Sequence, residues 1–168
     1  NRGGSLGYAN GNNVSGLSGG YLGVGLDVFG NYGTASESKN GGMPGNGLNP
    51  NVIGIRGSEH SNIGAPYRWL GGSQPLNQVF GNNFTLDYKG SGGTRPTKEQ
   101  HYRRVQVRII PVELNGVTTY EMSIHLKVNE NSPFFPIVPA FTIDEPPPPS
   151  LKIGFAGVTG GSNNIHEV

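Results

Sequence analysis

The chain has 168 residues, a formal net charge of +1 and no cysteine, which excludes disulfide bonds and thiolate metal sites. It has no stripe of Lys and Arg for phosphate contacts and no apolar run near the ~20 residues of a membrane-spanning helix, so we expect neither nucleic-acid binding nor membrane insertion. Its low charge and abundant Gly, Asn, Ser and Thr favour a secreted or cell-surface location.

Short apolar runs separated by turn-forming residues predict an all-β domain. The 29 Gly and 13 Pro suit turns between strands, and we find no long run with the apolar period of a helix. Several short strands joined by turns are typical of a two-sheet sandwich, and we treat residues 1–168 as one domain. Besides a hairpin at 104–128, the predicted strands are, in chain order, Ser5–Ala9, Tyr21–Phe29, Val52–Arg56, Phe84–Tyr88, Leu151–Val158 and Ile165–Val168.

The hairpin is the clearest of these elements. Apolar and polar residues alternate over Arg104–Ile109 and again over Tyr120–Val128. Between them, Asn115 and Gly116 both tolerate the positive φ that a tight two-residue turn requires. The alternation predicts that one face of the hairpin is buried and the other lies in water.

The stretch Tyr21–Asn31 places oxygen donors at the end of an apolar strand. Asp27 carries a carboxylate, Asn31 carries an amide four residues later, and the backbone carbonyl of Phe29 lies between them. Calcium takes six to eight oxygens from groups of these kinds. Asp and Asn also cap strand ends in ordinary turns. The spacing alone therefore leaves two interpretations open, a calcium site and a turn.

Three motifs follow one another in a fixed order along the chain. Gly3-Gly4-Ser5-Leu6-Gly7 comes first, Asp27-Val28-Phe29-Gly30-Asn31 ends the next strand, and Gly154-Phe155-Ala156-Gly157-Val158-Thr159-Gly160 precedes His166-Glu167-Val168. Together they resemble the motifs of the legume-type (L-type) lectins, above all those of bacterial members. The resemblance implies a concanavalin-like antiparallel β-sandwich, or jelly roll, whose first and last strands lie outside this chain.

The resemblance also implies a binding site. By analogy with the family, calcium would be held by Asp27, the carbonyl of Phe29, Asn31 and, where the family has an Asp, Glu37. The implied sugar contacts are Gly3 or Gly4 through a backbone N–H, Asn31, and the variable loop Gly160, Gly161, Ser162, Asn163 and Asn164. Tyr32, beside Asn31, is the expected apolar contact for a sugar. Plant members hold a second metal through a Glu and a His, but the matching positions here are Gly25 and Val52, so we expect calcium only.

Catalysis is not expected. Sandwich glycosidases carry Glu-x-Asp-x-x-Glu on one strand, whereas the matching stretch here has Gly25, Asp27 and Gly30. A possible aromatic platform at Tyr67–Trp69 is more often a cover over the core. The sequence therefore predicts a calcium-dependent module of a secreted or surface bacterial protein that adheres to glycans. The alternative is a structural or protein-binding sandwich of a surface filament or large adhesin, in contact with other segments or subunits.

Overall fold

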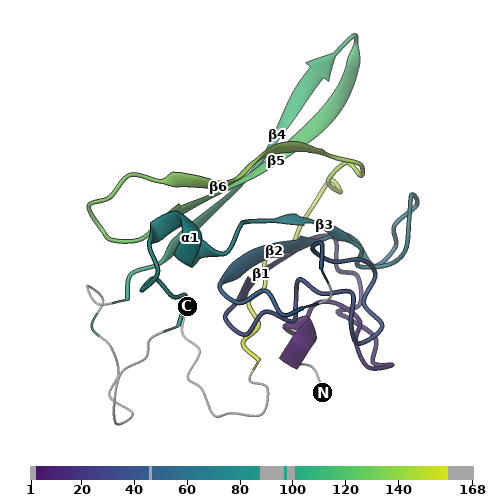
Figure 1. Cartoon of the computed structure of the whole chain (residues 1–168). Coiled ribbons are helices and arrows are strands. Elements are labelled where there is room, and N and C mark those ends of the chain that lie inside the picture. Colours follow the sequence, from purple (N-terminus) through teal and green to yellow (C-terminus); the bar gives the residue numbers. More distant parts are fainter. Residues whose placement is uncertain (1–2, 46, 88–96, 98–100, 159–168) are drawn as a thin grey trace.

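Two three-stranded antiparallel sheets form the frame of the molecule (Figure 1). The computed structural model describes residues 3–45, 47–87, 97 and 101–158. The first sheet has the order β1 (Gly23–Asp27), β2 (Val52–Arg56), β3 (Trp69–Gly72), and the second has the order β4 (Arg104–Leu114), β5 (Val117–Lys127), β6 (Phe135–Ile143). The described helices are a 3₁₀ turn, η1 (Gly3–Ser5), and the short α1 (Leu76–Phe80). The all-β class predicted from the sequence is confirmed.

The two sheets share one apolar core, as layers of a sandwich do. Ile53 and Ile55 of β2 pack in the same cluster as Met122, Ile124 and Leu126 of β5. All five side chains are buried, so the inner faces of both sheets are removed from water. The cluster also includes Leu76 of α1.

The first sheet is covered on its other face as well. Alternation turns Gly23, Gly25 and Asp27 of β1 away from the shared core. In the register of the ladder their partners on β2 are Arg56, Gly54 and Val52 respectively. Loops before β1, between β1 and β2 and between β2 and β3 cover this face and form a second cluster around Ala9, Tyr32 and Tyr67. The candidate functional residues lie on this loop-covered face.

The hairpin has the predicted strands and turn. β4 pairs with β5 without interruption up to Leu114 and Val117, and Asn115 and Gly116 have φ of 52° and 77° between them. Met122, Ile124 and Leu126 are buried, as the alternation predicted. The strands run further toward the turn than predicted, and this end of the hairpin projects beyond the two layers (Figure 1).

Several other strand predictions were wrong. Ser5–Ala9 is a turn, because Leu6 and Gly7 both have positive φ. Residues 84–87 and 151–158 form no strand. β1 is shorter than the predicted strand Tyr21–Phe29, and β2 has the predicted bounds. β3 and β6 were not predicted. Tyr88 and Ile165–Val168 lie outside the described residues, and the concanavalin-like arrangement of strands stays a prediction.

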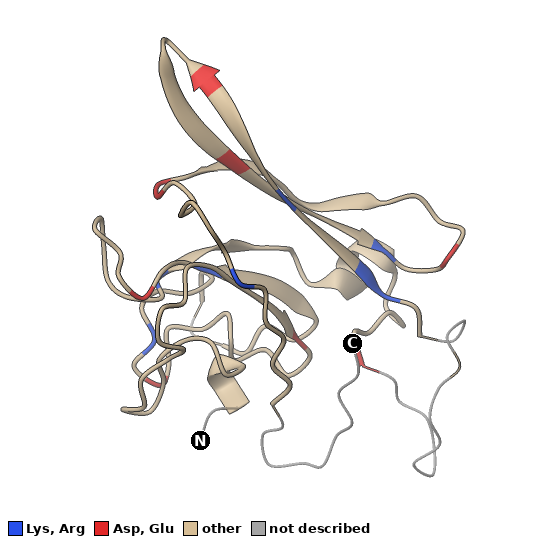
Figure 2. Ribbon diagram, turned by 180° about the vertical axis from the view of Figure 1, so that it is seen from behind, with Lys and Arg blue, Asp and Glu red and all other residues tan. Residues whose placement is uncertain are grey.

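Charged residues are sparse over the described part of the chain (Figure 2). Of the described Lys and Arg residues, Arg103, Arg104 and Arg108 lie beside or on β4 and Lys127 lies on β5, and the others are spread over β2 and the loops. Among the described residues there is no helix with the length and apolar character needed to cross a membrane.

Candidate functional site

Asp27 closes the turn that follows β1. Its side chain is 3% exposed, and its two carboxylate oxygens accept hydrogen bonds from the backbone N–H groups of Gly30, at 2.8 Å, and Tyr32, at 2.6 Å. Burial raises the pKa of Asp27, and these backbone hydrogen bonds oppose the rise. Of the two interpretations that the spacing left open, the turn is therefore present in the structure.

Tyr32 packs under this turn rather than at the surface. Its side chain is 0% exposed, and its hydroxyl donates to the carbonyl of Gly23 at 3.3 Å. The ring lies so close to the sheet that a Cβ at Gly25 would be 2.5 Å from it and one at Gly54 would be 3.0 Å away. This burial corrects the prediction that Tyr32 contacts a sugar, and it explains why both strands carry glycine at this level.

Arg56 is a buried cation surrounded by backbone carbonyls. Its guanidinium donates six hydrogen bonds, two of them to the carbonyl of Tyr32 at 3.1 and 2.9 Å. The other acceptors are the carbonyls of Thr34, Asn40, Gly41 and Tyr67 at 3.0–3.1 Å. Burial lowers the pKa of Arg56, and within the described residues no carboxylate forms an ion pair with it. The guanidinium therefore fixes the backbone of the loop from Tyr32 to Gly41.

Trp69 covers this guanidinium. The Arg56 Cζ atom lies 5.5 Å from the ring centroid of Trp69 and 5.4 Å from that of Tyr32. A Cβ added at Gly72 would meet the Trp69 ring at 2.9 Å, so the indole lies flat on the sheet. Of the two roles considered for the aromatic residues at 67–69, the cover over the core agrees with the structure.

A second buried cation lies at the same loop. Lys39 has a fully buried side chain, and its Nζ lies 2.7 Å from Oε2 of Glu37, whose side chain is 27% exposed. Glu37 and Ser38 both have positive φ, at 59° and 62°, and this turn brings the lysine back under the loop. Burial raises the pKa of Asp27, and the Lys39 charge, after the backbone hydrogen bonds, opposes that rise.

Gly4, Asn31 and Glu37 come together from separate parts of the chain. A Cβ added at Gly4 would lie 2.1 Å from Oε2 of Glu37 and 2.7 Å from Nδ2 of Asn31. The backbone N–H of Asn12 donates to the carbonyl of Glu37 at 2.7 Å, which ties the N-terminal segment to the loop. A side chain at position 4 would have to displace the Glu37 carboxylate and the Asn31 amide. The structure thus brings together residues that the sequence assigned to one site.

The C-terminal segment reaches the same neighbourhood. A Cβ at Gly7 would lie 3.3 Å from Cγ2 of Val158 and 3.4 Å from Cβ of Ala156. Gly7 follows η1, which carries Gly4. The predicted sugar loop, Gly160, Gly161, Ser162, Asn163 and Asn164, begins two residues later and lies outside the described residues.

The loop does not fit a calcium ion. Both oxygens of Asp27 already accept backbone N–H groups, and an ammonium occupies the Glu37 carboxylate. Calcium needs six to eight oxygens around a shared centre, and the buried ammonium beside Glu37 opposes a second cation there by charge repulsion. The described residues contain no group of three His, Cys, Asp or Glu that would suit a metal. Gly25 and Val52, in the positions of the second metal of plant lectins, carry no donor side chain.

Phe29 is the site residue that sequence reasoning placed in a different role. Its carbonyl was predicted to hold calcium, but its side chain is 66% exposed on the turn between Asp27 and Asn31. Connecting segments run over the protein surface, and the position of Phe29 after the end of β1 was the available signal in the sequence. Its ring, in place of the buried Tyr32, is free to meet an apolar ligand face.

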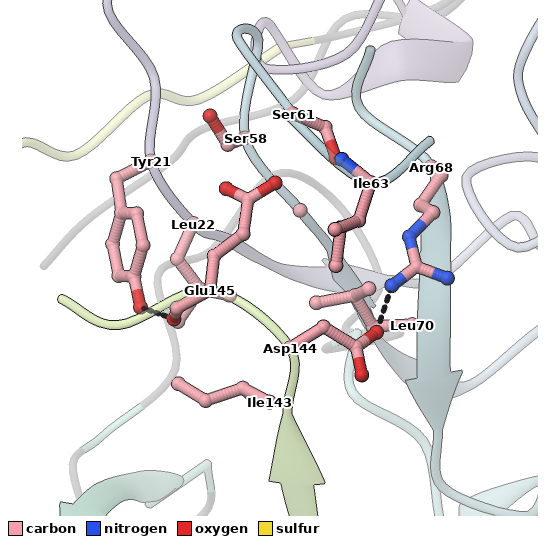
Figure 3. A pocket seen from close by; sticks show the side chains of 11 residues that line it. Tyr21, Leu22, Ser58, Ser61, Ile63, Arg68, Leu70, Ile143, Asp144 and Glu145 are labelled. Carbon is pink, nitrogen blue, oxygen red and sulfur yellow. Dashed lines mark hydrogen bonds and ion pairs between the residues drawn. The ribbon is translucent and has the colours of Figure 1, made fainter. Parts of the chain in front are cut away.

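A separate hollow lies at the other end of the first sheet (Figure 3). There Arg68 forms an ion pair with Asp144, and the hydroxyl of Tyr21 donates to the carbonyl of Glu145 at 2.8 Å. Leu22, Ile63 and other residues line the rest of it. These contacts attach the chain after β6 to the first sheet, so we assign this hollow a structural role.

Comparison of the chain with protein families, with curated proteins and with solved structures finds no match. The resemblance to L-type lectins therefore rests on the three sequence motifs and stays a prediction.

Proposed function

We propose that the chain is a carbohydrate-binding module that acts without catalysis, with its ligand at the loop cluster of Gly4, Asn31 and Glu37. The observation that carries this proposal is the approach of the Gly4 backbone to the Asn31 amide and the Glu37 carboxylate. Sugar hydroxyls both donate and accept hydrogen bonds, so a site for them needs an amide and a carboxylate at fixed positions.

Rigidity supports this proposal. The turn that carries Asn31 is closed by the two hydrogen bonds of Asp27, and the loop that follows is fixed by Arg56. Polar groups that are ordered before binding lose little conformational entropy when the ligand arrives. Asn31 and Glu37 are only partly buried, so both side chains are within reach of a ligand.

Phe29 supplies the apolar part of the proposed site. Sugars present patches of C–H groups that pack against aromatic rings, and the Phe29 ring is exposed beside Asn31. The motifs shared with bacterial L-type lectins favour a secreted or surface protein that adheres to glycans. Calcium, predicted from the same resemblance, is left out of this proposal because the Lys39 ammonium already contacts the carboxylate of Glu37, one of the predicted calcium ligands.

A glycan array tests the proposal. We expect the chain to bind a subset of glycans and Asn31→Ala to lose that binding at least tenfold, because the amide donates and accepts at the centre of the cluster. Asn131→Ala is the matched control, since Asn131 is exposed in the connection between β5 and β6. Equal binding by the two variants contradicts the assignment of the site.

The second candidate is a protein-binding module, and the projecting hairpin favours it. Ile110, Leu114 and Val117 are exposed near its turn, where apolar side chains suit contact with another protein. Under this alternative the array stays silent on every glycan while the chain remains folded.

A further inference from the structure

We propose that Lys39 is a built-in cation that takes the place of calcium and positions the sugar-binding loop without a metal. The inference deepens the proposed function, but its main test reads metal binding and thermal stability and needs no glycan. Lys39 is a positioning residue in this account, because it acts on the ligand site through the carboxylate of Glu37.

The first argument is location. The Lys39 ammonium is 2.7 Å from Glu37 Oε2, its side chain is fully buried, and Asp27 at the start of the same loop is 3% exposed. These are the two carboxylates that the lectin motifs assign to calcium. Asn31 lies between them in sequence, and its amide meets Gly4 together with Glu37. A buried positive charge therefore holds one of the two acidic groups of the proposed sugar-binding loop directly.

The second argument is chemical equivalence. A divalent ion would draw two carboxylates together and order the loop between them. An ammonium offers one positive charge and three donors, which is enough to balance part of the same negative charge when the side chain is fully buried. Water does not solvate the buried ammonium, so its charged form is stabilised by the neighbouring carboxylate instead.

The third argument is that Arg56 binds the main-chain carbonyls that an ion would otherwise bind. Calcium also binds main-chain carbonyls. Here the guanidinium of Arg56 donates hydrogen bonds to five carbonyls, four of which belong to residues 32–41. Lys39 contacts a carboxylate and Arg56 contacts main-chain carbonyls. The two cations together therefore meet both kinds of ligand that a metal would need.

Calcium alone is the probe for the main experiment. The melting temperature of the whole chain is measured in millimolar Ca²⁺ and in excess chelator. We expect the two values to agree within about 1 °C for the unchanged chain, because no site is open. A rise of several degrees in Ca²⁺ overturns the proposal, since the ion would then bind despite Lys39.

Lys39→Met removes the ammonium and keeps the length of the side chain. We expect its melting temperature in chelator to fall by about 5–10 °C, because Glu37 loses its buried cation. We also expect Ca²⁺ to restore part of this loss, which a merely structural lysine would not produce. Lys152→Met, at an exposed position, is the control and should show neither effect. No gain of a Ca²⁺ response in Lys39→Met overturns the proposal.

A double variant keeps the test decisive if Lys39→Met folds poorly. Lys39→Met with Glu37→Gln removes both charges of the pair, so we expect it to be more stable than Lys39→Met alone and to lose the Ca²⁺ response. A Ca²⁺ response that persists in the double variant places the ion elsewhere and contradicts the inference.

Glycan readouts separate this inference from the proposed function. Binding that survives chelator in the unchanged chain agrees with both, whereas binding abolished by chelator overturns the role of Lys39 and leaves the sugar site standing. Silence on all glycans, combined with a Ca²⁺ response gained by Lys39→Met, refutes the sugar site and supports Lys39 as the internal cation.

Discussion

Replacement of Arg56 by Met should remove more stability than any other change to a single charged side chain in the first sheet. Met fills much of the same space but donates no hydrogen bond. The guanidinium makes six hydrogen bonds to five carbonyls, and only the carbonyl of Asn40 has another donor, the backbone N–H of Trp69 at 2.8 Å. Four carbonyls in the described structure thus lose their only protein donor.

The magnitude follows from those four carbonyls. An unpaired buried acceptor costs roughly 1–3 kcal/mol, and the lower end applies because water can reach part of the loop. Four such losses give about 4 kcal/mol. The guanidinium itself no longer has to be desolvated, and this gain keeps the total near that value rather than above it. The expected loss is therefore a large share of the ~5–15 kcal/mol of a typical domain.

Urea unfolding measures this loss. With a slope of about 2 kcal/mol per molar urea, the midpoint of Arg56→Met should fall by about 2 M. Arg68→Met is the control, because Arg68 forms a partly exposed ion pair with Asp144 and such pairs contribute at most ~1 kcal/mol. Midpoints that fall equally in the two variants refute the role given to the buried guanidinium.

Two further substitutions test the ligand site. Gly4→Ala should lower the free energy of unfolding in urea by about 1–3 kcal/mol and weaken glycan binding, because the new methyl group overlaps the Glu37 carboxylate. Gly47→Ala is the control, because its new methyl group meets no atom within 4 Å and should change neither quantity. Equal effects of the two substitutions would contradict the packing at Gly4. Phe29→Ala should leave stability unchanged and weaken glycan binding about threefold to tenfold, as expected for loss of an aromatic contact. Titration calorimetry measures this, with Leu114→Ala as the exposed control, and unchanged affinity would remove the ring from the site.

Local patterns predicted the hairpin and β2. The alternation in β5 and the positive-φ pair Asn115-Gly116 left no second arrangement for the hairpin, and β2 was found with its bounds. β6 was missed because Pro136 and Pro139 interrupt its pattern, although an edge strand accepts proline where its N–H has no partner. Ser5–Ala9 was misassigned because its alternation resembles a strand, whereas Leu6 and Gly7 take a positive φ.

The candidate site was predictable only where its residues are close in sequence. Asp27 and Asn31 were identified as one turn, and the meeting with Gly4 and Glu37 followed from the family motifs. The two cations were not foreseen. Lys39 and Arg56 lie in stretches without a recognisable charge pattern, and their burial depends on the path of the loop and on Tyr32 and Trp69, which a sequence does not reveal.

Glycan binding at the loop cluster is the central claim, and NMR titration of the isotope-labelled chain tests it most directly. Addition of a bound sugar, in the presence of chelator, should shift the backbone amide signals of Gly4, Asn31 and Glu37 while those at the end of the hairpin near Leu114 stay in place. Shifts confined to the hairpin, or none at these three residues under saturating sugar, would contradict the account.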